Sequence, residues 1–167
     1  MTVVFFVVYM HDMPSRSNIS PLAQSLLDTC LCHNARMASR VITRAYDEAL
    51  RPTGLRATQV AVLAAVGARG ALSIKSLADS LEMERTTLTR NLRPLEELGY
   101  VAIAPEGRHR SRELILTKSG QAALLEALPL WEAAQRSAMR QLGDQRWPAV
   151  QKAFADLINK VHRPSAP

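Results

Sequence analysis

Hydrophobic residues recur at helical spacing along most of the chain, and serine, proline and glycine mark where helices begin and end. Ser20 followed by Pro21 is typical of a helix start, because serine caps a helix and proline fits its first position. No further glycine or proline interrupts the pattern before Pro52. We therefore predict one long helix over residues 21–50, ended by a turn over residues 51–54.

Three shorter helices and a hairpin are expected next. Gly67 and Gly70 stop the first helix, Ser73 caps the second, and Gly99 follows the third at a position that favours glycine. Two short runs with strand-like alternation follow, separated by a turn at Pro105. The expected helices cover residues 58–66, 74–81 and 84–98, and the expected strands cover residues 100–104 and 112–116.

Two further helices complete the pattern. Thr117 is expected to cap a helix that reaches residue 142, and a last helix ends near residue 161. Pro94 and Pro129 fall inside predicted helices and are expected to kink them, because proline donates no backbone hydrogen bond. The pattern predicts a mainly α-helical protein with one small β-hairpin.

The helix over residues 84–98 has two chemically different faces. At 100° per residue, Leu88, Leu92 and Leu95 share one face, and threonine and arginine occupy the other. Such side chains can contact phosphates, thymine methyl groups and guanine edges in a major groove, although an ordinary solvated face is the alternative. The candidate DNA-binding residues on this helix are Thr86, Thr87, Thr89, Arg90 and Arg93.

The tip of the predicted hairpin is strongly basic. Arg108, Arg110 and Arg112 fall within five residues, with His109 among them. Arginines this close repel one another, so a DNA backbone or minor groove is a better explanation for them than a solubilising turn. Arg108, His109 and Arg110 therefore join the candidate DNA-binding residues.

Composition adds charge to this picture. The 167 residues include 21 basic and 15 acidic ones, a net charge of +6, and only four of the basic residues are lysine. Arginine binds phosphates and guanine edges with two parallel hydrogen bonds, which suits a nucleic-acid partner, but many basic proteins bind no nucleic acid and the charge alone does not decide it. Cys30 and Cys32 are too few for a disulfide framework, which favours a reducing, cytoplasmic compartment. We expect no metal site and no cofactor.

The apolar run over residues 3–8 is too short to span a bilayer and lacks the flanks of a signal peptide. Three interpretations are open: an arm that packs on a partner subunit, a disordered tail with an aggregation liability, or an upstream extension before Met10 or Met13. None of them predicts a membrane partner.

From residue 20 to residue 161 the chain resembles the MarR family of winged helix-turn-helix regulators. The specific stretches are residues 77–81 (LADSL), 84–92 (ERTTLTRNL), 95–101 (LEELGYV), the arginine-rich hairpin and 116–120 (LTKSG). The resemblance implies a homodimer joined by long first and last helices and bound to double-stranded DNA. It also implies a palindromic operator, with half-sites about one helical turn apart, and repression relieved by a small ligand or an oxidant.

The chain departs from the family at one position of the wing, and the resemblance divides it into four parts. Family hairpins commonly carry an acid two residues before the wing arginine, whereas Arg108 stands there before Arg110, which leaves the wing more basic and less firmly braced. The expected parts are an N-terminal arm or extension (1–19), a helical dimerisation region (20–56 and 117–161), a winged helix-turn-helix lobe (57–116) and a flexible tail (162–167).

The stretch from Leu31 to Tyr46 is similar to the first helix of the organic-peroxide-sensing branch of the family. The resemblance implies that Cys32 is the oxidised residue and that Tyr46 hydrogen-bonds it, while Arg36 stands where the branch has a second tyrosine. Arg36 is one turn from Cys32, where a cation favours thiolate. Tyr46 is about 21 Å further along the helix, so it can meet Cys32 only across a dimer.

Two other interpretations of this helix are open. In one, both cysteines are small, inert core residues. In the other, an aromatic or carboxylate effector binds a cleft between the long helix and the DNA-binding lobe. The candidate lining residues of that cleft are His33, Met37, Arg40 and Trp131.

We therefore predict a dimeric DNA-binding transcriptional regulator, a repressor, and not an enzyme. A winged-helix module for protein–protein contacts is the alternative, and the basic face argues against it. A thiol enzyme that uses Cys32 and His33 is disfavoured, because neighbours on a helix point about 100° apart and no third group orients the histidine. The chain also lacks the P-loop, G-x-S-x-G and H-E-x-x-H motifs.

Overall fold

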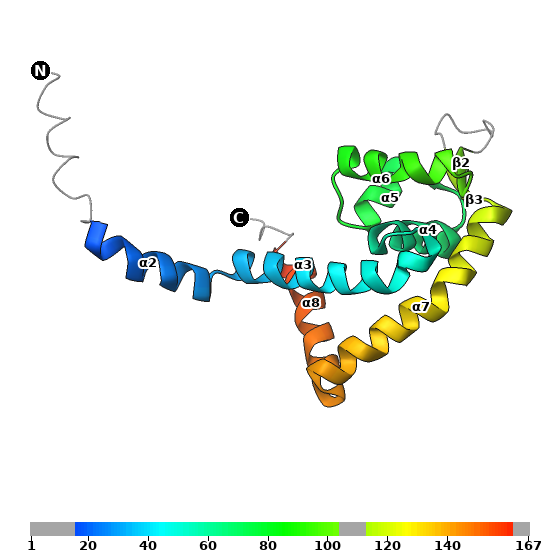
Figure 1. The fold of residues 1–167 in the computed structure, drawn as a ribbon. Coiled ribbons are helices and arrows are strands. Elements are labelled where there is room, and N and C mark those ends of the chain that lie inside the picture. The colour runs from blue at the N-terminus through cyan, green and yellow to red at the C-terminus, as the bar shows by residue number, and fades with distance from the viewer. Residues whose placement is uncertain (1–15, 104–112, 162–167) are drawn as a thin grey trace, which may run out of the picture. The chain divides into compact units, whose positions relative to one another are not determined.

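Helices make up most of the computed structural model, which describes residues 16–103 and 113–161 (Figure 1). The chain divides into two compact units, residues 1–41 and 42–167. Helix α3 (Leu31–Leu50) contributes to both, and the winged helix-turn-helix elements all lie in the second unit.

The expected first helix is in fact two helices. α2 covers Arg16–Thr29 and α3 covers Leu31–Leu50, so the prediction of one helix that starts at Pro21 is wrong in its start and in its continuity. Pro21 lies inside α2, where the missing N–H removes one backbone hydrogen bond without ending the helix.

Side chains satisfy backbone groups at the break between α2 and α3. Cys30 Sγ accepts a hydrogen bond from the backbone N–H of His33 at 3.4 Å. The Asn34 side-chain amide donates to the carbonyl oxygens of Leu27, Asp28 and Cys30 at 3.4, 3.2 and 3.0 Å. Polar side chains thus stabilise the interruption locally, and these contacts were not expected from hydrophobic spacing.

A tight corner joins α3 to α4 (Ala57–Arg69). It contains the short helix η1 (Arg51–Thr53) and Gly54, whose φ of 71° suits glycine. Asp47 of α3 caps α4 from outside, since its Oδ1 accepts a hydrogen bond from the N–H of Ala57 at 2.7 Å. The predicted start at residue 58 was therefore one residue late, because the capping acid is remote in sequence.

The β-sheet has three strands, one more than the predicted hairpin. β1 (Leu72–Ser73) pairs with β3 (Glu113–Leu116), which also pairs with β2 (Val101–Ile103), and both pairings are antiparallel. The strand order is therefore β1-β3-β2. α4 also continues through Gly67 to Arg69, beyond its predicted end at residue 66.

The helix-turn-helix consists of α5 (Ile74–Ser80) and α6 (Arg85–Glu97). Ser73 caps α5 as predicted, because its hydroxyl accepts from the N–H of Ser76 at 3.1 Å. The turn between the helices is closed by the N–H of Met83, which donates to the carbonyl of Ala78 at 2.9 Å. α6 runs through Pro94 as one helix.

The carboxyl-terminal helices lie close to their predicted bounds. α7 covers Lys118–Leu142 with Pro129 inside it, and the short helix η2 (Asp144–Arg146) leads into α8 (Trp147–Val161). The N-cap of α7 is Thr117, whose hydroxyl accepts from the N–H of Gly120 at 3.0 Å, as predicted.

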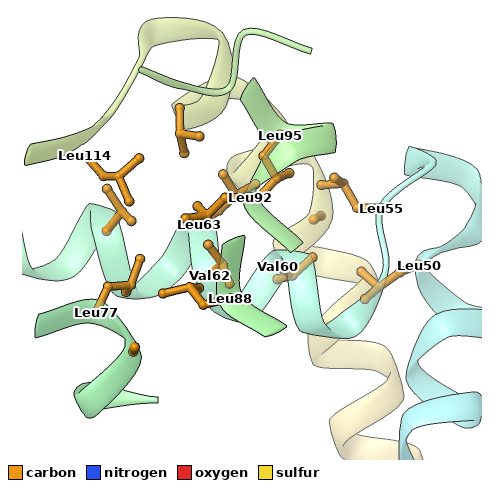
Figure 2. Close-up of a cluster of buried hydrophobic side chains, with 14 residues drawn as sticks. Leu50, Leu55, Val60, Val62, Leu63, Leu77, Leu88, Leu92, Leu95 and Leu114 are labelled. Carbon is orange, nitrogen blue, oxygen red and sulfur yellow. The ribbon is translucent and has the colours of Figure 1, made fainter. Parts of the chain in front are cut away.

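One hydrophobic core holds the second unit together (Figure 2). Leucines and valines from α4, α5, α6 and β3 meet there, and Leu50 and Leu55 extend the core toward the corner after α3. Among the described residues no polar or charged side chain is buried. Leu77 and Ala78 of α5 and Leu88 of α6, which hold the two helices of the helix-turn-helix together, are all buried.

We expect Asp47→Ala to lower the free energy of unfolding by about 1–2 kcal/mol, because the amino end of α4 loses its cap. Chemical denaturation of both proteins measures the difference. The matched control is Glu48→Ala, which breaks only an exposed ion pair with Arg51 and should change stability by less than about 0.5 kcal/mol. Equal losses in the two variants would contradict the capping role.

Candidate nucleic-acid interface

The orientation of α6 is set by its buried leucines. Leu88, Leu92 and Leu95 are 0–2% exposed and pack in the core that Figure 2 shows. Since these three residues share one face, helical geometry turns the opposite face of α6 away from the core. The predicted two-faced character of this helix is confirmed.

The outer face of α6 carries cations and hydroxyl groups. Thr86, Thr89, Arg90 and Arg93 are exposed, and Thr87 is half-buried. Arg85, which the sequence analysis did not single out, is exposed at the start of the same helix. Arg85 could have been predicted from the sequence, because it lies one helical turn before Thr89 and therefore on the same face.

Hydrogen bonds within α6 determine which atoms of these side chains remain available to a partner outside the protein. The Thr89 hydroxyl donates to the carbonyl of Arg85 at 2.8 Å, so its methyl group and oxygen lone pairs are what an outside partner can use. Asn91 is engaged similarly, since its amide donates to the carbonyl of Thr87 at 3.0 Å.

The arginines of this face differ in their partners. Arg93 Nε lies 3.0 Å from Glu97 Oε1, in a pair whose side chains are 80% and 63% exposed. Such an exposed pair is weak and screened by salt, so a phosphate or a base can compete with it. Arg90 has no ion pair with any other residue that the structure describes, which leaves its guanidinium available to DNA.

The wing is described only at its base. β2 and β3 pair in the register Val101↔Leu116, Ala102↔Ile115 and Ile103↔Leu114, so the base of the predicted hairpin is confirmed. The predicted contact residues Arg108, His109 and Arg110 lie outside the described residues.

The candidate redox residues all belong to α3. Cys32 and Arg36 are exposed, whereas Tyr46 is half-buried and its hydroxyl donates to Gln135 Oε1 of α7. Cys30 is half-buried and stands at the break before α3. The described chain therefore brings Tyr46 to Gln135, a partner that sequence reasoning did not anticipate because 89 residues separate them.

Burial also changes the acidity of Tyr46. Desolvation raises the pKa of its phenol above the ordinary value near 10. At neutral pH the group is thus a neutral hydroxyl, suited to donating the hydrogen bond to Gln135.

The candidate effector residues fall in both units. Met37 and Arg40 are exposed and His33 is half-buried in the first unit, and Trp131, 38% exposed, belongs to the second. A cleft formed by all four stays a prediction.

Two other features are absent from the described residues. No three histidine, cysteine, aspartate or glutamate side chains within residues 16–103 and 113–161 gather closely enough to hold a metal ion. Over the same ranges no helix combines the length and the apolar character needed to cross a membrane.

Comparison with known proteins decides the family. Residues 53–111 match a family model described as MarR family. The uncharacterized HTH-type transcriptional regulator YwoH of Bacillus subtilis (strain 168) is 30% identical over 97 residues, which are 58% of this chain and 71% of YwoH. The chain belongs to the MarR family.

Solved structures of the MarR family share the fold seen here. The crystal structure of the M. tuberculosis transcriptional regulator MosR is 37% identical, with a TM-score of 0.72 over 81% of this chain and 98% of MosR. A second MosR structure, in complex with DNA, is 38% identical, with a TM-score of 0.71 over 80% of this chain and 96% of that one. The winged helix-turn-helix fold predicted from the motifs is confirmed.

Family membership also defines the class of function. This MarR-family protein is a DNA-binding transcriptional regulator and not an enzyme. The alternative of a protein-interaction module without DNA binding therefore loses its support.

We expect Arg90→Ala to weaken binding to specific DNA by about tenfold and to relax base preference at one position in each half-site. Selection of binding sites from random duplexes measures the preference. Arg140→Ala, an exposed arginine on α7, is the control and should leave the selected sequence unchanged. If Arg90→Ala selects the wild-type sequence, a base-reading role for Arg90 is wrong.

We expect Tyr46→Phe to be less stable than wild type at pH 8, with a difference that shrinks above pH 10. The folded-state pKa is raised, so the unfolded phenol ionises first and stabilises the unfolded wild type as pH rises. Urea denaturation of both proteins between about pH 8 and about pH 11 follows this difference. A constant difference across that range would contradict the raised pKa of the Tyr46 phenol.

Proposed function

We propose that this protein is a dimeric repressor that binds a two-fold symmetric operator through α6 and the wing and is released by a signal sensed on α3. The observation that carries the DNA contact is the outer face of α6, where exposed threonines and arginines lie opposite the buried leucines. The proposed contacts are Thr86, Thr87, Thr89, Arg90 and Arg93 of α6, and Arg108, His109 and Arg110 of the wing.

Uncovered apolar side chains support the dimer. No described residue of α2 is buried, and large hydrophobic residues of α3, α7 and α8 are also exposed. Large exposed apolar side chains that recur along such helices are typical of a protein interface. The most exposed members on these helices are Leu22, Leu26, Leu31, Val41, Leu125 and Ile158, at 53–67%. Residues 20–56 and 117–161 are therefore the proposed dimerisation region.

Two-fold symmetry follows from such a dimer. Two identical α6 helices related by a two-fold axis require an operator whose half-sites are inverted copies, about one helical turn apart. The MosR structure determined in complex with DNA, at 38% identity, supports DNA binding by this chain.

An oxidant is the proposed signal. Cys32 is exposed, which gives a peroxide access to its thiol, and Arg36 lies one turn away on α3. Oxidation transfers one peroxide oxygen to the thiolate, giving a sulfenic acid on Cys32 and releasing the peroxide's other oxygen as an alcohol. The alternative signal is an aromatic or carboxylate effector bound by His33, Met37, Arg40 and Trp131.

The test measures DNA binding by the purified full chain. A fluorescently labelled duplex from upstream of its own gene should bind specifically as two chains per duplex, and more weakly at about 200 mM than at about 50 mM salt. Absence of specific binding, both there and among random duplexes, would overturn the proposed function.

An organic hydroperoxide then tests the signal in the same assay. We expect it to release wild type and the control Cys30→Ser, whereas Cys32→Ser should stay bound. Release of Cys32→Ser would remove the sensor role of Cys32. If no protein is released, an organic hydroperoxide is not the signal, and the aromatic or carboxylate effector becomes the signal to test.

A further inference from the structure

The carboxyl end of α6 is tied to the start of α7 by two side-chain hydroxyl groups. Thr117 Oγ1 donates to the carbonyl of Gly99 at 2.6 Å, and Ser119 Oγ donates to the same oxygen at 2.8 Å. A carbonyl oxygen has two lone pairs, so it can accept both bonds. We call Thr117, Ser119 and the Gly99 carbonyl the hydroxyl clasp.

The Gly99 carbonyl moves with the last turn of α6. Gly99 has a φ of 68°, and its N–H donates to the carbonyl of Glu96 at 2.9 Å. The N–H of Tyr100 donates to the carbonyl of Leu95 at 2.8 Å. These two bonds form a Schellman motif, which fixes the residues after a helix to its final turn.

Tight packing accompanies the hydroxyl clasp on the α7 side. Gly120 is buried, and a side chain there would collide with the carbonyl oxygen of Tyr100. The backbone N–H of Thr117 donates to that same oxygen at 3.1 Å. The first turn of α7 therefore cannot shift without moving the chain that leaves α6.

The other half of α7 is bonded to α3. Gln135 accepts the hydrogen bond of Tyr46 and lies 16 residues after Ser119 in one continuous helix, about 24 Å along its axis. One helix, with Pro129 between the two contacts, thus connects α3, which carries the proposed sensor, to the end of the helix that carries the proposed DNA contacts.

We propose that Thr117 and Ser119 are positioning residues for DNA recognition, because the hydroxyl clasp fixes α6 relative to α7 and so determines how sharply the protein distinguishes its operator from other DNA. This inference rests on the proposed function. Hydrogen bonds to bases require accurate placement of α6, whereas attraction to phosphates tolerates displacement. Loss of the clasp should therefore reduce sequence discrimination more than general DNA affinity.

The variants separate the clasp from simple helix capping. Ser119→Ala removes one clasp donor and leaves the bond between Gly120 N–H and the Thr117 hydroxyl in place. The double variant Thr117→Val with Ser119→Ala removes both donors and also the N-cap of α7, whereas Thr117→Ser in place of Thr117→Val keeps the cap and restores one donor. The matched control is Thr53→Val, since the Thr53 hydroxyl also bonds a helix-end carbonyl, that of Leu50 at 2.7 Å, at the corner after α3.

Two measurements are made on each full-length protein. The first is amide hydrogen exchange without DNA, followed at Leu98, Gly99 and Tyr100 and, for comparison, in α4. The second is the ratio of affinities for a duplex selected by wild type and for the same duplex scrambled.

In the double variant we expect faster exchange at the end of α6 but not in α4, and a discrimination ratio lowered about fivefold. Ser119→Ala should lower it less, and Thr117→Ser should recover part of the loss. Thr53→Val should leave the ratio unchanged.

Unchanged exchange at the end of α6 in the double variant would overturn the clasp, and an equal loss of discrimination in Thr53→Val would overturn its positioning role. If the wild-type protein binds every duplex equally well, the proposed function is wrong, and so is the role of Thr117 and Ser119 in DNA recognition. The exchange measurement, which needs no DNA, would still decide whether the clasp holds the end of α6.

Discussion

Burial of the leucine face of α6 is the interaction on which the rest of the structure depends. Leu88, Leu92 and Leu95 are almost completely removed from water, and burying each stabilises the lobe by about 1.5–3 kcal/mol. Because the three leucines share one face, the helix can bury them in only one rotational setting. That setting presents Arg90 and Arg93 to the outside, so the hydrophobic core determines where the positive charge is displayed.

Because no polar side chain of the described residues is buried in the core, the polar and charged groups that can contact a partner lie at or near the surface. None of the described residues buries a charged or polar group, so the described lobe contains no desolvated ion pair that could act as an internal switch. The arginines on the outer face of α6 instead interact through water and salt, which suits a polyanion such as DNA. Arg93 and its exposed partner Glu97 can separate at little energetic expense.

Helix α7 connects the parts that a regulator has to couple. Its start is bonded to the end of α6 through Thr117 and Ser119, and its second half accepts the hydroxyl of Tyr46 on α3. Tyr46 is where the resemblance to the peroxide-sensing branch places a partner of Cys32. In the described chain that hydroxyl is already engaged with Gln135, so sensing by Cys32 in a dimer would involve a tyrosine that also ties α3 to α7.

The sequence by itself determined the order of the elements, the two faces of α6 and the local caps. Ser73, Gly99 and Thr117 were predictable because each cap acts within a few residues of its own position, and the leucines of α6 because helical period is a local property. The family motifs pointed to the winged helix-turn-helix fold in the same way.

Only the tertiary structure decided which distant residues meet. The cap that Asp47 provides for α4, the pairing of Leu72 with Leu114, the clasp between Gly99 and Thr117 and the bond between Tyr46 and Gln135 join positions that are 10 to 89 residues apart. Sequence spacing carries no signal for such contacts, because they form only after the core has brought the elements together.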